Sequence, residues 1–142
     1  MNWLLLVYKV PREPTSCRVY VWRKLKQLGA VSVQDAIWVL PANPRTQEHF
    51  QWLAAEIIEL DGEVSLFQST IRLASDSDAL QGEFEKLIRK PYDKILRALN
   101  RKSPDLAALS KLYQQTKERD YFQSDLGEQV RKKLLKAKGP RK

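Results

Sequence analysis

The apolar positions at the start of the chain predict a strand followed by a helix. The run Trp3–Tyr8 is short, apolar and aromatic and stops at Pro11, which is typical of a buried strand. Thr15 or Ser16 can then cap a helix, whose apolar residues recur at helical spacing until Gly29, the expected left-handed stop. The residues expected to face the core are Val19, Trp22, Leu25 and Leu28.

Residues 31–62 predict extended structure and then a second helix. Residues 31–40 are rich in branched side chains and break near Gln34-Asp35, so they form either one bulged strand or a tight pair. Asn43-Pro44 places a capping side chain before a proline at the first helical position, and Asp61-Gly62 ends the helix. The apolar residues of this helix are Phe50, Leu53, Ala54, Ile57, Ile58 and Leu60.

Residues 63–73 predict a further strand whose buried face changes midway, as it would at a bulge. One face of this strand carries Val64 and Leu66, and the other carries Phe67, Ile71 and Leu73. The order of strand, helix, extended segment, helix and strand favours a ferredoxin-like, split β-α-β sheet with both helices on one face.

From Asp76 to the end of the chain the pattern is helical. Pro91 should break or kink the first helix, so that a second helical stretch covers Tyr92 to about Leu99. Ser103-Pro104-Asp105 starts a third helix with a cap and a proline, and Ser124 can open a last one. The whole pattern predicts an α+β fold. Its ferredoxin-like core covers residues 1–75, a basic helical extension in residues 76–142 packs on it, and the two form one structural domain.

The charge of the chain is concentrated in its second half. The 142 residues carry a net charge of +8, with 8 Lys and Arg against 7 Asp and Glu in residues 1–75 and 17 against 10 in residues 76–142. Such a bias attracts polyanions, because phosphate neutralisation releases counterions. A merely solubilising surface explains the same charge, and the sequence leaves both interpretations open.

Composition and motifs argue against membrane insertion, metal binding and catalysis. The longest apolar run is far shorter than the ~20 residues of a membrane span, and a single Cys17 indicates a cytoplasmic protein without an intramolecular disulfide. With one cysteine and His49 as the one histidine, the usual zinc ligand sets cannot form. Glu56 and Glu59 share a helix face that we interpret as solvated. No phosphate-binding glycine loop or nucleophile elbow occurs, so we expect no enzyme and no cofactor.

Two clusters of basic residues are the candidate functional surface. One lies on the first helix and the other near Pro91, where helical spacing aligns cations that could follow a nucleic-acid backbone. The expected phosphate-binding residues are Arg18, Arg23, Lys26, Arg89, Lys90, Lys94 and Arg97. The four tryptophans fall within predicted elements, so we interpret them as packing residues rather than base-stacking ones.

One segment of the chain resembles a known family. The pattern Arg-x-x-x-Trp-Arg-x-Leu-x-x-Leu-Gly in Arg18–Gly29, followed by Ile37–Pro41, resembles the N-terminal domain of the chromate-resistance regulator ChrB. Further similar segments are Trp52–Ile57, Asp61-Gly62-Glu63, Tyr92 and Asp120-Tyr121-Phe122. The resemblance implies a DNA-associated regulatory domain, with a sheet similar to those of phenylacetate-type repressors and of small CRISPR-associated ferredoxin-like nucleases.

Two departures from these families shape the expectation. The nuclease-like relatives place an aspartate at the end of the first strand, where this chain has Tyr8-Lys9-Val10, so nuclease chemistry is not expected. ChrB regulators continue into a chromate-responsive domain, whereas this sequence ends at Lys142. We therefore expect a DNA-binding regulatory module whose partners are DNA, a second copy through the sheet edge and a separate chromate-responsive domain. The alternative is a non-catalytic protein-interaction module that pairs with such a sensor domain or with an acidic partner.

Overall fold

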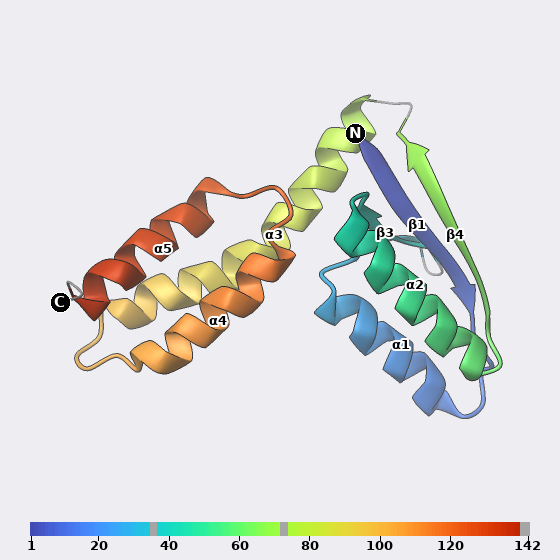
Figure 1. Cartoon of the computed structure of the whole chain (residues 1–142), viewed down its shortest axis with the longest axis horizontal. Coiled ribbons are helices and arrows are strands. Elements are labelled where there is room, and N and C mark those ends of the chain that lie inside the picture. The colour runs from blue at the N-terminus through green and yellow to red at the C-terminus, as the bar shows by residue number, and fades with distance from the viewer. Residues whose placement is uncertain (35–36, 72–73, 140–142) are drawn as a thin grey trace. The chain divides into compact units, whose positions relative to one another are not determined.

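The computed structural model describes residues 1–34, 37–71 and 74–139 and divides into two compact units, Met1–Leu80 and Gln81–Lys142. The first unit contains a four-stranded antiparallel sheet with the strand order β2-β3-β1-β4. Helices α1 and α2 lie on one side of this sheet (Figure 1). The elements are β1 (Asn2–Lys9), α1 (Thr15–Gln27), β2 (Val31–Gln34), β3 (Ile37–Pro41), α2 (Pro44–Glu59) and β4 (Glu63–Thr70).

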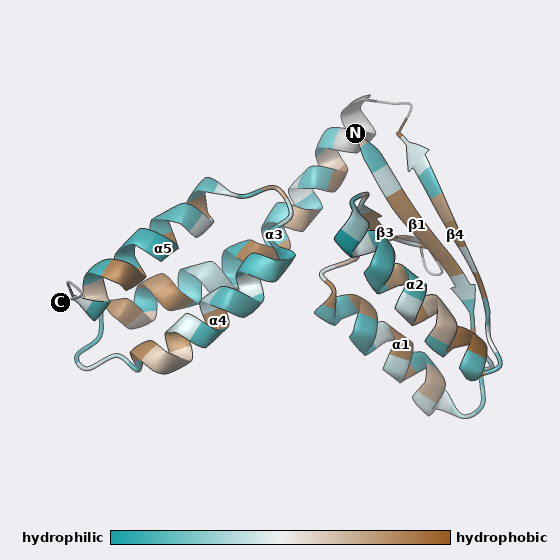
Figure 2. Cartoon of the chain, in the orientation of Figure 1, coloured by the Kyte–Doolittle hydropathy of each residue, from teal (hydrophilic) through white to brown (hydrophobic). Residues whose placement is uncertain are grey.

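The core of the first unit is built on β1, the central strand that pairs with both β3 and β4. Leu4 and Leu6 are buried on one face of β1, together with Leu40, the β3 partner of Leu4. Because strand side chains alternate, every second residue of β1 contributes to this layer. Figure 2 shows the hydrophobic colour concentrated along β1, whereas α5 of the second unit is largely hydrophilic.

Helix α1 forms as predicted, but a different stripe of it is buried. Gly29 has a φ of 74° and ends the helical segment in the left-handed region, which confirms the predicted stop. Of the expected core residues, Val19 and Trp22 are 39% and 50% exposed, whereas Leu25 is fully buried as predicted, and Val21 is fully buried beside it. The sequence contains two apolar stripes at helical spacing, one through Val19 and Trp22 and one through Val21 and Leu25, and packing against the sheet buries the second stripe.

The predicted side-chain cap of α1 is wrong, whereas that of α2 is confirmed. Helix α1 begins at Thr15, and its N-cap position is occupied by Pro14 without a side-chain hydrogen bond, so neither Thr15 nor Ser16 caps it. In α2, Asn43 Oδ1 accepts a 2.8 Å hydrogen bond from the Thr46 backbone N–H, and Thr46 Oγ1 accepts one from the Asn43 N–H. This reciprocal pair satisfies two backbone donors that a helix start leaves without partners.

The structure also shows which form each of the two predicted extended segments takes. Val31–Gln34 and Ile37–Pro41 form the pair of strands β2 and β3 rather than one bulged strand, with a register shift between Ser32 and Gln34. Strand β4 pairs regularly with β1 from Glu63 to Thr70, so the bulge expected there is wrong. Phe67 therefore lies on the face opposite Leu66 and is 54% exposed, because regular pairing keeps the alternation of side chains intact. Of the residues assigned to that strand, Leu73 lies outside the described ones.

Three helices form the second unit: the C-terminal part of α3 (Ala74–Leu99), α4 (Leu106–Arg119) and α5 (Asp125–Lys138). Helix α3 is continuous through Pro91, so the expected break into two helices is wrong. Ile88 and Tyr92, on either side of the proline, are both buried in the same core cluster, and this packing offsets the lost backbone hydrogen bond. That cluster consists of Ile88, Tyr92, Ile95, Leu109, Tyr113, Val130 and Leu134.

Of the caps predicted for the last two helices, that of α4 is wrong and that of α5 is confirmed. Helix α4 is capped by Asp105, whose carboxylate accepts from the Ala108 N–H at 3.1 Å, and not by Ser103 with Pro104 at the first position. Ser103 has a φ of 53° and belongs to the preceding turn, so the helix starts two residues later. Ser124 caps α5 as predicted, accepting from the Gly127 N–H at 3.1 Å.

The mixed α+β class is confirmed by these helices and strands. Among the residues that the structure describes, none of the helices is long and apolar enough to cross a membrane.

Candidate functional site

The basic residues near Pro91 form a stripe on the exposed side of α3. Lys86, Arg89, Lys90 and Arg97 are exposed and, with Asp93, line a shallow hollow of about 280 Å³. Counted from Lys86, the other positions lie three, four, seven and eleven residues further on, so at about 100° per residue they fall within one side of the helix. The result is a surface with four cations to one carboxylate, named here the α3 basic stripe.

The α3 basic stripe faces solvent because the opposite side of the helix packs in the hydrophobic core. Ile88, Tyr92 and Ile95 are between 0% and 4% exposed and pack in the core of the second unit. Packing of one helix side leaves the other to solvent, and the residues between Lys86 and Arg97 on that side are mostly cationic. The orientation of the stripe is therefore set by hydrophobic burial rather than by the charges themselves.

The cations of this stripe are largely free of acidic partners. The ion pairs within the described part of the chain are Lys86–Glu83 at 3.1 Å and Arg131–Glu128 at 2.6 Å. Arg89, Lys90 and Arg97 take part in neither pair, and they have to be solvated by water or by an external anion. Lys94 is exposed as well but does not line the hollow, so it flanks the stripe.

A second basic surface lies on α1 in the first unit. Arg18, Arg23 and Lys26 are all exposed, as expected from the sequence. They flank Trp22, which is 50% exposed. The seven predicted phosphate-binding residues are thus divided into three on the first unit and four on the second, and each set forms a surface of its own unit.

The interpretation of all four tryptophans as packing residues is half wrong. Trp3 and Trp38 are buried, at 1% and 4% exposure, whereas Trp22 and Trp52 are 50% and 67% exposed. The two buried residues lie on the central strands β1 and β3, and the two exposed ones lie on the outer sides of α1 and α2. A sequence signal was present for Trp22, because arginine or lysine occupies positions 18, 23 and 26 around it.

Lysine and tryptophan are in direct contact on this α1 surface. The Lys26 ammonium lies 5.6 Å from the centroid of the Trp22 ring and 5.8 Å from that of Trp38. Both distances are within the range of a cation–π interaction. One ring is exposed and the other buried, so Lys26 is held close to the protein surface instead of extending freely into water.

The pair of glutamates on α2 is explained by contact with α1. The Tyr20 hydroxyl donates a 2.6 Å hydrogen bond to Glu56 Oε2, and this bond, together with the charge of the carboxylate, raises the pKa of Tyr20. Glu56 is therefore not simply solvated, since it connects α2 to α1, whereas Glu59 is exposed. Within the described residues, no group of three or more His, Cys, Asp or Glu side chains could hold a metal ion.

A polar cluster in the second unit positions the α4–α5 turn. The sequence indicated its members separately, Tyr92 and Asp120 as family-similar positions and Ser124 as a helix cap, but did not predict that they meet. The Tyr92 hydroxyl donates to Asp120 Oδ2 at 3.0 Å, and the Ser124 hydroxyl donates to the same oxygen at 2.8 Å. Burial and the neighbouring Asp120 carboxylate raise the pKa of Tyr92. The cluster anchors the start of α5 on α3, which indicates a structural role.

Comparisons with known proteins agree on one family. A family model described as "Protein ChrB, N-terminal" matches residues 18–101, a range that includes α1 from Arg18 onward and the α3 basic stripe. A relative named Protein ChrB, from Cupriavidus metallidurans, is 37% identical over 62 residues. That alignment covers 44% of this chain and 19% of the relative, so the matching region is about a fifth of the relative's length.

Proposed function

Because the chain belongs to the ChrB N-terminal family, we propose that it is a DNA-binding regulatory module associated with chromate resistance. In this proposal the α3 basic stripe docks on DNA phosphates, and Lys94 and the α1 residues Arg18, Arg23 and Lys26 add further contacts. The partners are DNA, a second copy of the chain and a chromate-responsive domain. The setting is the cytoplasm, and the chain is regulatory rather than catalytic.

The observation that supports DNA binding most directly is the alignment of cations on α3, three of which, Arg89, Lys90 and Arg97, make no ion pair within the described residues. Lys86 and Arg97 are eleven residues apart, so the stripe extends about 17 Å along the helix. One DNA strand carries a phosphate about every 3.4 Å along the axis, so this length matches about five phosphates. A cation without a carboxylate partner contributes most when a phosphate replaces its counterion.

The sheet of the first unit supports two finer parts of the proposal. The order β1-α1-β2-β3-α2-β4, with β1 and β3 in the centre, supports the ferredoxin-like part of the proposal. The edge strand β4 is eight residues long, and an edge strand has free backbone groups to which a second copy could add. We expect dimerisation to use such an edge.

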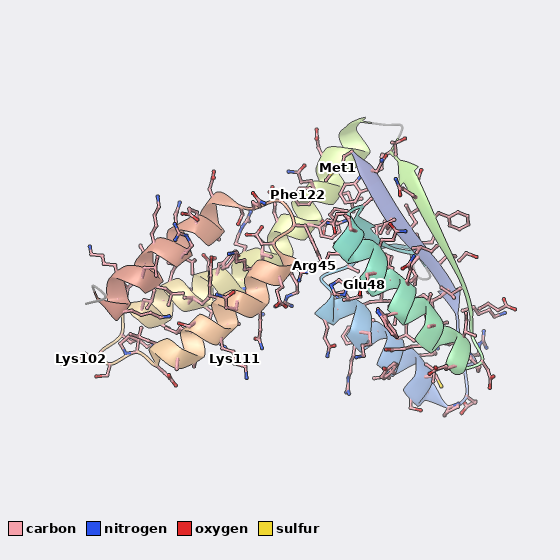
Figure 3. All side chains as sticks on the ribbon, viewed as in Figure 1. Met1, Arg45, Glu48, Lys102, Lys111 and Phe122 are labelled. Atoms are coloured by element: carbon pink, nitrogen blue, oxygen red, sulfur yellow. The ribbon has the colours of Figure 1, made fainter. Side chains whose placement is uncertain are left out.

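Salt-dependent binding to a labelled DNA duplex tests the proposal. With five to seven phosphate contacts, log affinity should fall against log salt with a slope of about 4 to 6. The double variant Arg89→Ala/Arg97→Ala should lower this slope by about 2. The matched control is Lys111→Ala/Lys117→Ala, which removes the same charge from exposed positions on α4. Lys111 projects outward from its helix (Figure 3).

The control variant distinguishes binding at the α3 basic stripe from attraction by the net charge of the chain. If both double variants weaken binding equally, the attraction is a property of net charge alone and the α3 basic stripe is not the site. A flat salt response would count against phosphate docking altogether. Capture of an acidic protein that survives nuclease treatment, without any duplex binding, would instead support the protein-interaction alternative.

A further inference from the structure

The exposed tryptophan on α1 is placed among cations that repeat along the same side of the helix. Arg18, Trp22 and Lys26 are four residues apart in turn, so they follow one another along the helix surface. Arg23 is exposed beside them. An aromatic ring between regularly spaced cations is the composition of surfaces that bind single-stranded nucleic acid, where phosphates meet the cations and a base stacks on the ring.

The environment of Trp22 differs from that of the other exposed tryptophan. Trp22 is 50% exposed and holds the Lys26 ammonium 5.6 Å from its ring, within a group of positive side chains. Trp52 is 67% exposed but shares its side of α2 with Glu48 and Glu56, four residues away in either direction. Both rings expose apolar surface, yet only the first lies in an electrostatic setting that attracts a polyanion.

We propose that Trp22 stacks on an unpaired base, so that α1 binds single-stranded nucleic acid or a locally opened strand, with Arg18, Arg23 and Lys26 on the flanking phosphates. This inference rests on the proposed nucleic-acid binding function and specifies the form of nucleic acid that α1 takes. In a duplex the faces of the bases are already stacked on one another, so an indole can stack only on a base that has left the helix.

The charges on α1 argue against the simplest competing explanation, which is a dimer that buries Trp22 against its own copy. A two-fold interface brings the same patch of both copies together. The cations Arg18, Arg23 and Lys26 of one copy would then face those of the other, and like charges in an interface are strongly unfavourable. A nucleic acid can stack a base on the Trp22 ring and neutralise the cations with its phosphates, whereas a second copy would cover the ring and leave the cations facing like charges.

Fluorescence polarisation with two labelled probes tests the inference. The probes are a single-stranded oligodeoxythymidylate and a mixed-sequence duplex of the same length, and the proteins are the full chain and its Trp22→Ala, Trp22→Phe and Trp52→Ala variants. Trp22→Ala should weaken binding of the single strand by about five- to 150-fold, the range for one base stacked on an aromatic ring. Duplex binding should fall by less than about threefold, because no phosphate contact is removed.

The remaining variants make the result specific. Trp22→Phe should restore most of the single-strand affinity, because a smaller ring still stacks, and Trp52→Ala should leave both affinities unchanged. The salt slope of Trp22→Ala should equal that of the unchanged chain, since no charge is lost. Unchanged thermal melting would show that the variants are folded, as expected for a half-exposed side chain.

Two outcomes would overturn the inference in distinguishable ways. If Trp22→Ala weakens the two probes equally, or weakens neither, base stacking by Trp22 is refuted, while duplex binding that depends on Arg89 and Arg97 would leave the proposed function standing. If the unchanged chain binds neither probe at any salt concentration, the inference and the proposed function both fail.

Discussion

Gly127 is the position at which the structure makes the sharpest prediction about stability. It lies in the first turn of α5, where its backbone N–H donates to the Ser124 cap. A Cβ added there would lie 2.7 Å from Asp120 Oδ2 and 2.8 Å from the Tyr92 hydroxyl oxygen. Both distances are shorter than carbon and oxygen atoms tolerate, so Gly127→Ala must move one or both of the groups that make the Tyr92–Asp120 hydrogen bond.

The expected loss of stability is the balance of two opposing effects. Replacing glycine by alanine in a helix normally stabilises a protein by about 1 kcal/mol. A hydrogen bond to a carboxylate contributes about 1.5–3 kcal/mol, and the displaced Asp120 accepts from both Tyr92 and Ser124. Losing one or two of these bonds outweighs the gain in helix propensity, so we expect Gly127→Ala to destabilise the chain by roughly 1–3 kcal/mol.

Gly82 provides the matched control, because it is also helical and, within the described residues, its added Cβ would meet no heavy atom within 4 Å outside its own stretch of helix backbone and its chain neighbours. Gly82→Ala should therefore raise stability by about 0.5–1 kcal/mol. Urea unfolding followed by far-ultraviolet circular dichroism would measure both variants, and a midpoint shift of about 0.5–1.5 M is expected for Gly127→Ala. Tryptophan fluorescence follows the first unit separately, because all four tryptophans lie in it.

The reasoning would be refuted if Gly127→Ala stabilised the chain as Gly82→Ala does. That result would mean that the Tyr92–Asp120–Ser124 cluster can widen without losing its hydrogen bonds. A destabilisation as large in Gly82→Ala as in Gly127→Ala would equally show that the predicted steric overlap is not the cause.

Four further predictions follow from individual residues. Tyr92→Phe should make the stability of the chain fall less steeply at alkaline pH. The folded chain keeps the Tyr92 proton above the ordinary pKa of 10.0, so the stability that Tyr92 contributes is complete below pH 10 and is lost as the pH rises toward the folded pKa. If the free energy of unfolding of Tyr92→Phe, measured by denaturant titration, fell with pH as steeply as that of the unchanged chain, this prediction would be contradicted. Asn43→Ala should lower the free energy of unfolding by about 1 kcal/mol through loss of the α2 cap, and a neutral result in urea unfolding would show that water replaces it. Pro91→Ala should raise thermal stability by about 1–3 kcal/mol, because it restores a backbone donor within α3; a lower melting temperature would show that packing of the proline ring matters more. Arg18→Ala combined with Arg23→Ala should reduce the salt slope of duplex binding by about 2, and unchanged binding would remove α1 from the DNA-binding surface.

Local signals in the sequence predicted several helix ends in both units. The cap at Asn43 with the following proline, the left-handed stop at Gly29 and the cap at Ser124 all depend on one or two residues and their own backbone. Each of these signals acts over a single helical turn, so nothing distant in the chain can change it. The alignment of the candidate basic residues Arg89, Lys90 and Arg97 could also be predicted from the sequence, because it depends on helical spacing alone.

The wrong predictions concern choices that distant parts of the chain make. Pro91 is a strong local signal for a break, yet the buried residues on both sides of it hold α3 together. On α1, two apolar stripes fit the helical period equally, and only the sheet beneath the helix determines that Val21 is buried and Trp22 exposed. The regular pairing of β4 likewise depends on β1, which lies more than fifty residues earlier.

The sequence by itself therefore determined the helix ends that one capping residue or glycine sets, at Gly29, Asn43 and Ser124, because hydrogen bonding and backbone preference are local. The starts of α1 and α4 and the course of α3 through Pro91 depended on more than these local signals. Tertiary structure decided which side of each element faces the core, because burial is a property of what packs against it. That second decision exposes Trp22 among its cations and turns the α3 basic stripe outward, and both functional proposals depend on it.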